Sequence, residues 1–206
     1  DRPRHFTQRL RELGLKVKRG GVPDRAAGLR AGVVGMGRNT FVYAPGYGSW
    51  INVEAWRVDA KLPPDRPTTA CPCPPDCRAC IEACPTGAIE EPFVMRMDRC
   101  VAYLTYGAPE PIAPDLWARM GCWIYGCDAC QDACPLNAGR WQPSEATPWL
   151  DAVAPRLTAE ALATMDDATY REHIHPLFWY ISPDNLQRWH KNAQRAVAAL
   201  RRKEAE

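Results

Sequence analysis

The feature that most constrains this chain is the placement of its cysteines, because all ten lie within residues 71–134. The pattern C-x2-C-x3-C-P occurs twice in that window, at residues 77–85 and at residues 127–135. Two matching phrases of this kind are typical of proteins that bind two iron-sulfur clusters. A disulfide scaffold would be shorter and would spread its cysteines through the fold. The window therefore predicts thiolates held for metal in a reducing compartment, and we expect a cytoplasmic protein.

Each phrase needs a further cysteine ahead of it. In bacterial two-cluster ferredoxins the closely spaced cysteines bind one cluster, and the cysteine before proline binds the other. Neither phrase has its leading cysteine at the usual C-x2-C spacing. Cys73 is nearer to the first phrase than Cys71 and is the preferred ligand. For the second phrase Cys100 and Cys122 both remain candidates.

Zinc is the alternative metal, since C-x2-C pairs also bind zinc in tetrahedral sites. The third cysteine and the proline that close each phrase are not expected at a zinc site. They favour iron-sulfur clusters, which would also contribute free energy to folding.

Length and charge exclude some classes of protein. A chain of 206 residues can bury a substantial core, and no run of 18 apolar residues is present to span a membrane. The net charge of +2 argues against a basic field over the whole protein, so nucleic acid is not an expected partner. The first 30 residues nevertheless hold nine basic side chains against three acidic ones. They form either a solvated face or a docking surface for an acidic redox partner or a phosphate-bearing ligand.

Apolar spacing and turn residues predict the elements before the cysteines. Residues 4–14 have the pattern of an amphipathic helix that stops at Gly14, and Asp24 is expected to cap a second helix over residues 25–31. Residues 40–44 and 50–59 are rich in β-branched and aromatic side chains, and a turn of Pro and Gly separates them. They predict a β-hairpin.

The glycines at residues 35–37 resemble half of a dinucleotide-binding fingerprint, but no third glycine follows. A tight turn, or backbone held close to another large cofactor, is the favoured interpretation.

The segment after the cysteines is expected to be helical. Residues 141–155 should pack across the cluster domain, Thr158 should cap a helix over residues 159–164, and a last helix should run from Ser182 to Lys203 with an apolar stripe and a solvated basic face. Two nearby histidines, His173 and His175, are either metal ligands or helix-end residues packed beside aromatics, and packing is favoured.

Three stretches carry a resemblance to a known family. Residues 77–89 (CRACIEACPTGAI), 98–105 (DRCVAYLT) and 125–137 (YGCDACQDACPLN) closely resemble the double-cluster domain of the epoxyqueuosine reductase and reductive dehalogenase superfamily. Residues 30–39 and 47–50 are similar to the segment that precedes the clusters there, which is part of a nitroreductase-like α/β core that holds cobalamin.

The resemblance implies the cofactors and their ligands. In the family the cysteine of the R-C-x-x-Y-L-T phrase is a ligand of the second cluster, which selects Cys100. Two 4Fe-4S clusters are then held by a first set, Cys73, Cys77, Cys80 and Cys134, and a second set, Cys84, Cys100, Cys127 and Cys130. Cobalamin is a further candidate cofactor, with Gly37, Arg38 and Asn39 as candidate contacts.

The implied fold is α+β, a partial nitroreductase-like α/β core with an inserted or appended ferredoxin-like domain. We expect a core with a β-hairpin over residues 1–68, the double-cluster domain over residues 69–140, and a helical segment over residues 141–206 that packs on the core. The family has a longer N-terminal half and a C-terminal repeat region. An Asp-Ser-Ala-Pro phrase, whose Asp donates a proton in epoxyqueuosine reductases, has no counterpart near residues 18–21, so queuosine chemistry is not carried over.

The expected function is that of an iron-sulfur oxidoreductase that relays electrons through both clusters to a buried site where cobalamin could bind. Its partners would be a soluble donor of the ferredoxin or flavodoxin type and a small-molecule substrate. The alternative is a ferredoxin-like electron-transfer or docking module without catalysis of its own. No catalytic residue is assigned; Tyr103, Tyr106 and Tyr125 lie near cluster ligands and are either proton donors or buried packing residues, packing being the commoner role.

Overall fold

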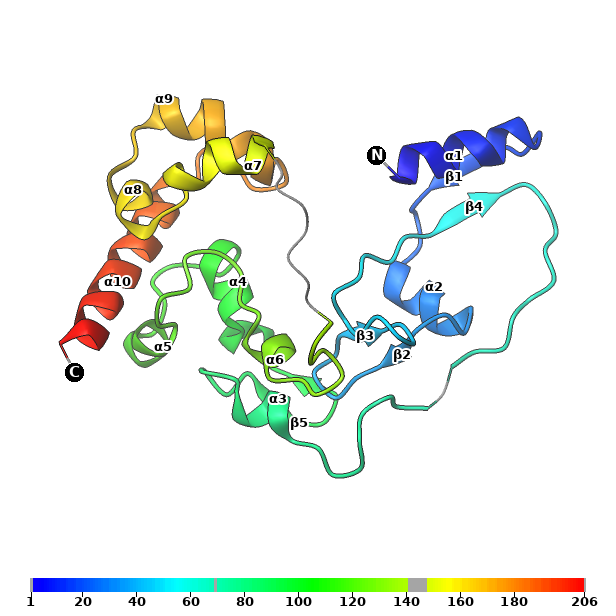
Figure 1. Cartoon of the computed structure of the whole chain (residues 1–206), viewed down its shortest axis with the longest axis horizontal. Coiled ribbons are helices and arrows are strands. Elements are labelled where there is room, and N and C mark those ends of the chain that lie inside the picture. Colours follow the sequence, from blue (N-terminus) through cyan, green and yellow to red (C-terminus); the bar gives the residue numbers. More distant parts are fainter. Residues whose placement is uncertain (1, 69, 141–147, 206) are drawn as a thin grey trace. The chain divides into compact units, whose positions relative to one another are not determined.

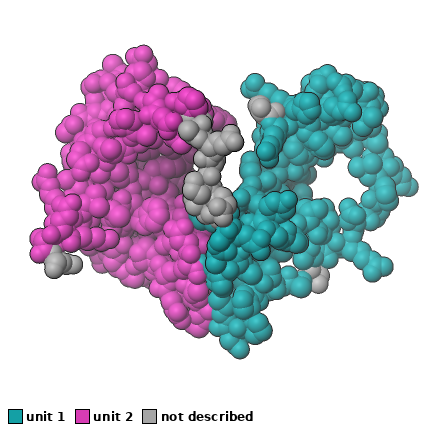
Figure 2. Space-filling view, viewed as in Figure 1, with its two compact units in different colours: residues 1–77, 134–141 teal, residues 78–133, 142–206 magenta. Residues whose placement is uncertain are grey.

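The computed structural model describes residues 2–68, 70–140 and 148–205. They divide into two compact units (Figure 2). Unit 1 contains residues 1–77 and 134–141, and unit 2 contains residues 78–133 and 142–206. The elements of both units are labelled in Figure 1. No helix among the described residues combines the length and the apolar character that a membrane crossing requires.

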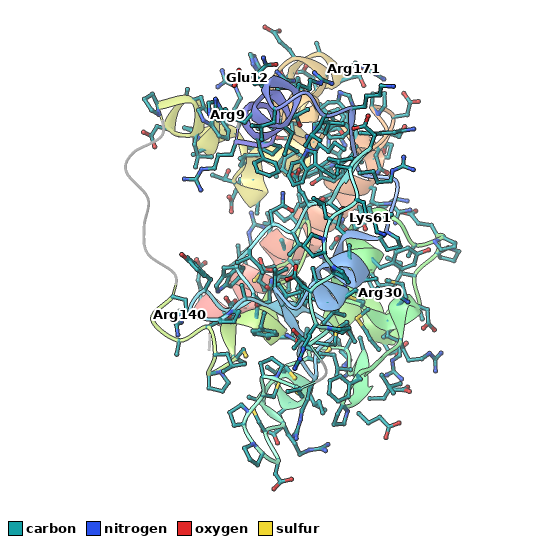
Figure 3. All side chains as sticks on the ribbon, turned by 90° about the vertical axis from the view of Figure 1, so that its right-hand side faces the viewer. Arg9, Glu12, Arg30, Lys61, Arg140 and Arg171 are labelled. Atoms are coloured by element: carbon teal, nitrogen blue, oxygen red, sulfur yellow. The ribbon has the colours of Figure 1, made fainter. Side chains whose placement is uncertain are left out.

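Unit 1 is built from two helices and two short antiparallel strand pairs. Its elements are α1 (Arg2–Glu12), β1 (Val17–Arg19), α2 (Asp24–Arg30), β2 (Gly35–Met36), β3 (Val42–Tyr43) and β4 (Trp56–Val58). Helix α1 ends at Glu12, and Gly14, the predicted stop residue, follows with a φ of +81°. The N–H of Gly14 binds the carbonyl of Arg11, and the N–H of Leu15 binds that of Leu10. This is a Schellman motif, which favours glycine at the left-handed position. On α1 the side chains of Arg9 and Glu12 form an ion pair of 2.7 Å (Figure 3).

The predicted hairpin between residues 40–44 and 50–59 is wrong. Strand β3 pairs backwards with β2, placing Gly35 opposite Tyr43, and β4 pairs with β1, placing Val17 opposite Val58. The chain turns tightly between Ala44 and Gly48, but residues 50–55 then run without strand pairing.

Asp24 does not cap α2 as expected. Pro23 is the N-cap residue, and Asp24 is the first residue of the helix. The Asp24 carboxylate instead accepts a hydrogen bond of 2.8 Å from the N–H of Ala55. Asp24 therefore links the start of α2 to the segment before β4, which has no strand pairing.

Unit 2 combines one β-hairpin with a set of helices. Its elements are α3 (Ala79–Glu82), β5 (Ile89–Glu91), β6 (Val94–Met95), η1 (Met97–Arg99), α4 (Val101–Tyr106), α5 (Pro114–Arg119), α6 (Ala129–Asp132), α7 (Pro148–Val153), η2 (Ala154–Arg156), α8 (Ala159–Thr164), α9 (Asp167–Thr169), η3 (Tyr170–Ile174), η4 (His175–Phe178) and α10 (Leu186–Glu204). The α+β class is as predicted. Residues 141–147 of the segment expected to pack across the cluster domain lie outside the described residues.

Two apolar clusters form the core of unit 2. The larger one joins α8, η3 and α10 through Leu162, Tyr170, Ile174 and Trp189. The smaller one joins α4 to Met120, which follows α5. Each fully buried side chain of this size contributes about 1.5–3 kcal/mol. Helix α8 has the predicted bounds, and Thr158 caps it by accepting a hydrogen bond of 3.2 Å from the N–H of Ala161.

Helix α10 differs from its prediction at both its start and its buried face. It begins at Leu186, because Ser182 closes a turn with Asn185 instead of capping the helix. The expected solvated basic face is also wrong at Arg195, which is only 7% exposed. Its guanidinium donates to the carbonyls of Gly121 and Trp123. Backbone carbonyls therefore replace water around this charge.

Candidate metal centre

The parts of the two cysteine phrases that belong to unit 2 fold in the same way. Each forms a four-residue helix, α3 or α6, and the middle cysteine of the phrase lies inside it. The preceding residues have matching backbone angles, with φ −122° and ψ 6° at Arg78 and φ −113° and ψ 8° at Asp128. Helices α3 and α6 pack against each other. The repeated sequence thus gives a repeated local structure.

The second set of cysteines lies together in unit 2. Burial raises the pKa of Cys127 to about 11, and the nearby Cys100 and Cys84 add to this effect. Burial likewise raises the pKa of Cys130 to about 12, with Cys127, Cys100, Cys80 and Cys84 as further causes. The structure therefore groups all four predicted ligands closely enough for their charges to interact.

These raised pKa values bear on whether the thiols fit a metal cluster. Ligation requires thiolates, and several buried thiolates repel one another unless a cation compensates their charge. Iron supplies that positive charge. Among the described residues no three His, Cys, Asp or Glu side chains converge tightly enough for a single metal ion. A four-iron cluster is bound through separate iron atoms and holds its thiolates further apart.

Backbone N–H groups donate to two sulfurs of the second set, Cys84 and Cys127. Cys84 Sγ accepts a hydrogen bond of 3.1 Å from the N–H of Ala88, and the N–H of Ala129 lowers the otherwise raised pKa of Cys127. The hydroxyl of Thr86 lies 3.9 Å from Cys84 Sγ and donates to the carbonyl of Arg99 at 2.6 Å. Such donors stabilise negative sulfur and are a recognised means of adjusting iron-sulfur clusters.

A buried asparagine of α10 supports the segment that leads to Cys127. Asn192 is 1% exposed, and its amide donates at 2.9 Å to the carbonyls of both Thr105 and Ile124. The Thr105 hydroxyl in turn accepts from the N–H of Gly126 at 3.0 Å. These contacts join α10, α4 and the second cysteine phrase.

Three members of the first set lie in unit 1. Cys73 Sγ accepts a hydrogen bond of 3.4 Å from the N–H of Arg38, and the Arg38 guanidinium donates to the carbonyl of Cys77 at 2.7 Å. Burial raises the pKa of Cys73 to about 11, opposed by the Arg38 N–H and reinforced by the thiols of Cys71 and Cys134. The fourth member, Cys80, belongs to unit 2, so its assignment to the first set rests on the sequence motif.

A tyrosine that the sequence did not single out contacts the first set. The hydroxyl of Tyr43 donates to Cys134 Sγ at 3.3 Å and accepts from the amide of Asn39 at 2.9 Å. Burial, followed by the Cys134 contact, raises the pKa of Tyr43 well above its ordinary value of 10. The phenol therefore keeps its proton and remains a donor.

The residues predicted as corrinoid contacts form the turn that presents these donors. The N–H of Gly37 binds the carbonyl of Phe41 at 2.8 Å, and its own carbonyl accepts from the N–H of Thr40 at 2.9 Å. A Cβ at Gly37 would collide with the Tyr43 ring. The tight-turn interpretation is thus confirmed. Arg38 and Asn39 direct polar groups to the cysteine segment and to Tyr43, and their contact with a corrinoid stays a prediction.

The spare cysteines have different surroundings. Cys71 is exposed and lies next to Cys73 in unit 1. Cys122 is exposed in unit 2 and lies near the buried guanidinium of Arg195, whose pKa burial lowers to about 10.

The tyrosines near the second set are engaged in aromatic packing. The Tyr125 ring stacks on Trp189 with centroids 5.4 Å apart, and its hydroxyl lies 2.6 Å from that of Tyr180. The Tyr103 and Tyr106 rings form an edge contact at 6.5 Å. The packing interpretation therefore fits these side chains better than a role in proton supply.

Of the two histidines, His175 fits the interpretation of packing beside an aromatic ring. His175 binds the carbonyl of Ile181 at 3.1 Å, and its ring lies 6.2 Å from that of Tyr170. His173 lies 3.8 Å from the carboxylate of the adjacent Glu172. Both contacts are those of residues at helix ends.

Unit 1 contains a cleft of about 740 Å³ whose walls are rich in aromatic rings. Phe6, Tyr47, Trp50 and Trp56 contribute to its lining, together with Arg2 and Glu54 as charged residues. This volume lies within the usual range of ligand pockets.

Comparisons with known proteins agree with the cysteine geometry. Residues 73–137 match the family described as a 4Fe-4S double cluster binding domain. The epoxyqueuosine reductase of Prochlorococcus marinus is 34% identical over 176 residues, which cover 80% of this chain and 55% of the relative. That of Bacillus subtilis is 35% identical over 126 residues, covering 60% of this chain and 31% of the relative.

Solved structures of these reductases share the fold. A structure of the Bacillus subtilis epoxyqueuosine reductase matches with a TM-score of 0.77 and 25% identity, covering 98% of this chain and 55% of that one. A crystal structure of epoxyqueuosine reductase with an epoxyqueuosine-modified tRNA stem loop matches equally well. The chain thus spans about half the length of these relatives. The predicted resemblance is confirmed: the chain is a relative of the epoxyqueuosine reductases and carries their iron-sulfur domain, which binds two 4Fe-4S clusters.

Proposed function

We propose that this chain relays single electrons through two 4Fe-4S clusters to a buried acceptor, as part of an epoxyqueuosine reductase-like enzyme. The observation that carries the proposal is the group of four thiols in the second set, in which burial raises the pKa of Cys127 and Cys130 and a bound cation would compensate the charge of the thiolates. The proposed ligands are those of the first set, Cys73, Cys77, Cys80 and Cys134, and of the second set, Cys84, Cys100, Cys127 and Cys130.

When bound, the clusters would supply one-electron chemistry. The chain's own residues hold the sulfurs, exclude water and donate hydrogen bonds to negative charge. In the second set Ala88 and Ala129 donate through backbone N–H groups. In the first set Arg38 donates through its backbone and Tyr43 through its side chain.

The proposed acceptor is a corrinoid held in unit 1. The aromatic cleft offers an apolar surface, and the turn of Gly37, Arg38 and Asn39 is the candidate for polar contacts. A soluble ferredoxin or flavodoxin would supply the electrons. Stable thiolates and reduced clusters suit the cytoplasm, where we place the protein.

The proposed substrate is a modified tRNA nucleoside. The support is a relative's structure in complex with an epoxyqueuosine-modified tRNA stem loop. This proposal revises the expectation, drawn from the near-neutral net charge, that nucleic acid is not a partner. A tRNA substrate would be tested by filter binding of the purified chain to the modified and unmodified stem loops. Equal absence of binding would leave a small molecule as the substrate class.

Anaerobic purification with iron, sulfide and zinc analysis tests the relay. About eight irons per chain and a broad absorbance near 400 nm are expected for two 4Fe-4S clusters. Zinc without iron would disprove the proposal.

The alternative function is a ferredoxin-like electron-transfer or docking module with no catalysis of its own. Incubation of the iron-loaded chain with cobalamin, followed by gel filtration and a visible spectrum, separates the two. Corrin bands that co-elute with the protein support the reductase. Clusters that reduce and reoxidise without retained corrinoid favour the module.

A further inference from the structure

One cysteine of the first set receives a hydrogen bond from a phenol. Tyr43, in strand β3, reaches Cys134 across 91 positions of sequence, and its hydroxyl lies 3.3 Å from the sulfur. Tyr43 is 4% exposed and Cys134 is 7% exposed. Because water is largely excluded here, the hydrogen bond acts at a low local dielectric and has a larger electrostatic effect on sulfur than it would at the surface.

Asn39 holds the Tyr43 hydroxyl from its other side. The Asn39 amide is buried at 2% exposure and donates to the Tyr43 oxygen at 2.9 Å. The Tyr43 oxygen therefore acts as an acceptor toward Asn39, with Ser49 as a further hydrogen-bond neighbour, while the hydroxyl donates its proton to Cys134 Sγ. Asn39 is itself oriented, because its carbonyl oxygen accepts from the N–H of Phe41 at 3.2 Å.

The hairpin of β2 and β3, which contains Tyr43, brings a second donor to the first set. The turn between β2 and β3 places the N–H of Arg38 3.4 Å from Cys73 Sγ. Its geometry is closely constrained, since a Cβ at Gly37 would collide with the Tyr43 ring. One hairpin thus provides a backbone donor to Cys73 and a side-chain donor to Cys134.

We propose that the β2–β3 hairpin sets the reduction potential of the cluster bound by Cys73 and Cys134, with Tyr43 as the positioning residue that raises it. Reduction adds one negative charge, which the cluster shares with its thiolates. A donor aimed at a thiolate stabilises that charge and favours the reduced state. The inference rests on the proposed function, because it requires these cysteines to be cluster ligands.

The test is an EPR-monitored potentiometric reduction of the anaerobically purified, iron-loaded full chain. Tyr43→Phe removes the donor and keeps the ring. The reduction equilibrium of one of the two clusters should change by about tenfold. For one electron this equals a shift of its EPR-monitored potential by 59 mV to lower potential. The other signal should stay at its wild-type potential. Tyr106→Phe, which alters a 44% exposed tyrosine in unit 2, is the matched control and should shift neither.

A second variant keeps the test decisive if Tyr43→Phe fails to load iron. Incorporation of 3-fluorotyrosine at position 43 preserves the shape and strengthens the hydroxyl as a donor, so the same signal should move to higher potential. Wild-type iron content with unchanged potentials in both variants would overturn the inference and leave the relay standing. A wild-type chain that binds no iron-sulfur cluster would instead overturn the proposed function itself.

Discussion

The two cysteine phrases have the same sequence pattern, but the cysteines that end them, Cys84 and Cys134, receive hydrogen bonds from different kinds of donor. Cys84, in unit 2, is followed by a turn that returns the N–H of Ala88 to its own sulfur at 3.1 Å. Cys134, in unit 1, instead receives the hydroxyl of Tyr43 from a distant hairpin. The spacing of a phrase therefore determines where its sulfurs lie, whereas the donors that act on them can come from elsewhere in the chain.

A second difference lies three residues after each of these cysteines. Gly87 occupies that position in the first phrase and has a φ of +64°. Asn137 occupies it in the second phrase, is 5% exposed, and uses its side chain to bind the N–H and the hydroxyl of Ser49, both at 2.8 Å. In both phrases the N–H at this position donates to the carbonyl of the cysteine, at 3.1 Å for Gly87 and 2.9 Å for Asn137. The first phrase differs in the left-handed backbone of Gly87, and the second in a side chain that links it to Ser49, 88 positions earlier.

The largest expected effect concerns the ligands themselves. Cys100→Ala should reduce the iron content from about eight to about four per chain, because one of two 4Fe-4S clusters loses a ligand. The measurement is iron and sulfide analysis of anaerobically purified protein.

Cys122→Ala is the matched control, since it removes the other candidate ligand of the same phrase. Full iron content in this variant would agree with the assignment of Cys100. Loss of half the iron from Cys122→Ala, with Cys100→Ala intact, would contradict it and reverse the choice between them.

The next largest effect tests the contact between the Asn137 side chain of the second phrase and Ser49. Asn137→Ala leaves the N–H of Ser49 without its partner in a buried place, and an unmade buried hydrogen bond costs about 1–3 kcal/mol. Denaturant unfolding of the iron-loaded chain measures the change. Asn52→Ala, at an exposed asparagine of unit 1 whose amide donates to the Glu54 carboxylate at 3.2 Å, is the comparison. An equal loss from both variants would show that the Ser49 contact has no special role.

The cysteine pattern was predictable because it depends on spacing over a few residues. The same holds for α8, since its Thr158 cap lies next to the helix that it begins. Residues that are only a few positions apart can adopt few arrangements, so the sequence alone predicts such segments well.

The strand pairing was not predictable for the opposite reason. Strands β2 and β3 contain two residues each, too few to show an alternating pattern, and β4 pairs with a strand about forty residues earlier. Apolar periodicity identifies the buried Leu186, Trp189 and Ala193 of α10. It misses Asn192 and Arg195, which are buried against backbone carbonyls. A helical pattern marks polar side chains as exposed and gives no signal that carbonyls will replace water.

The smallest expected effect tests the backbone closure of the first phrase. A Cβ at Gly87 meets only the Arg119 guanidinium, at 3.8 Å, so there is room for a side chain. The cost of Gly87→Ala then comes from the left-handed conformation, about 1–2 kcal/mol in unfolding free energy. Gly87→Asn should cost less, because asparagine adopts this conformation more readily than alanine, although it introduces a larger side chain. If Gly87→Asn lowered the free energy of unfolding more than Gly87→Ala in denaturant, space rather than φ would limit this turn. The left-handed backbone at Gly87 would then no longer distinguish the first phrase from the second.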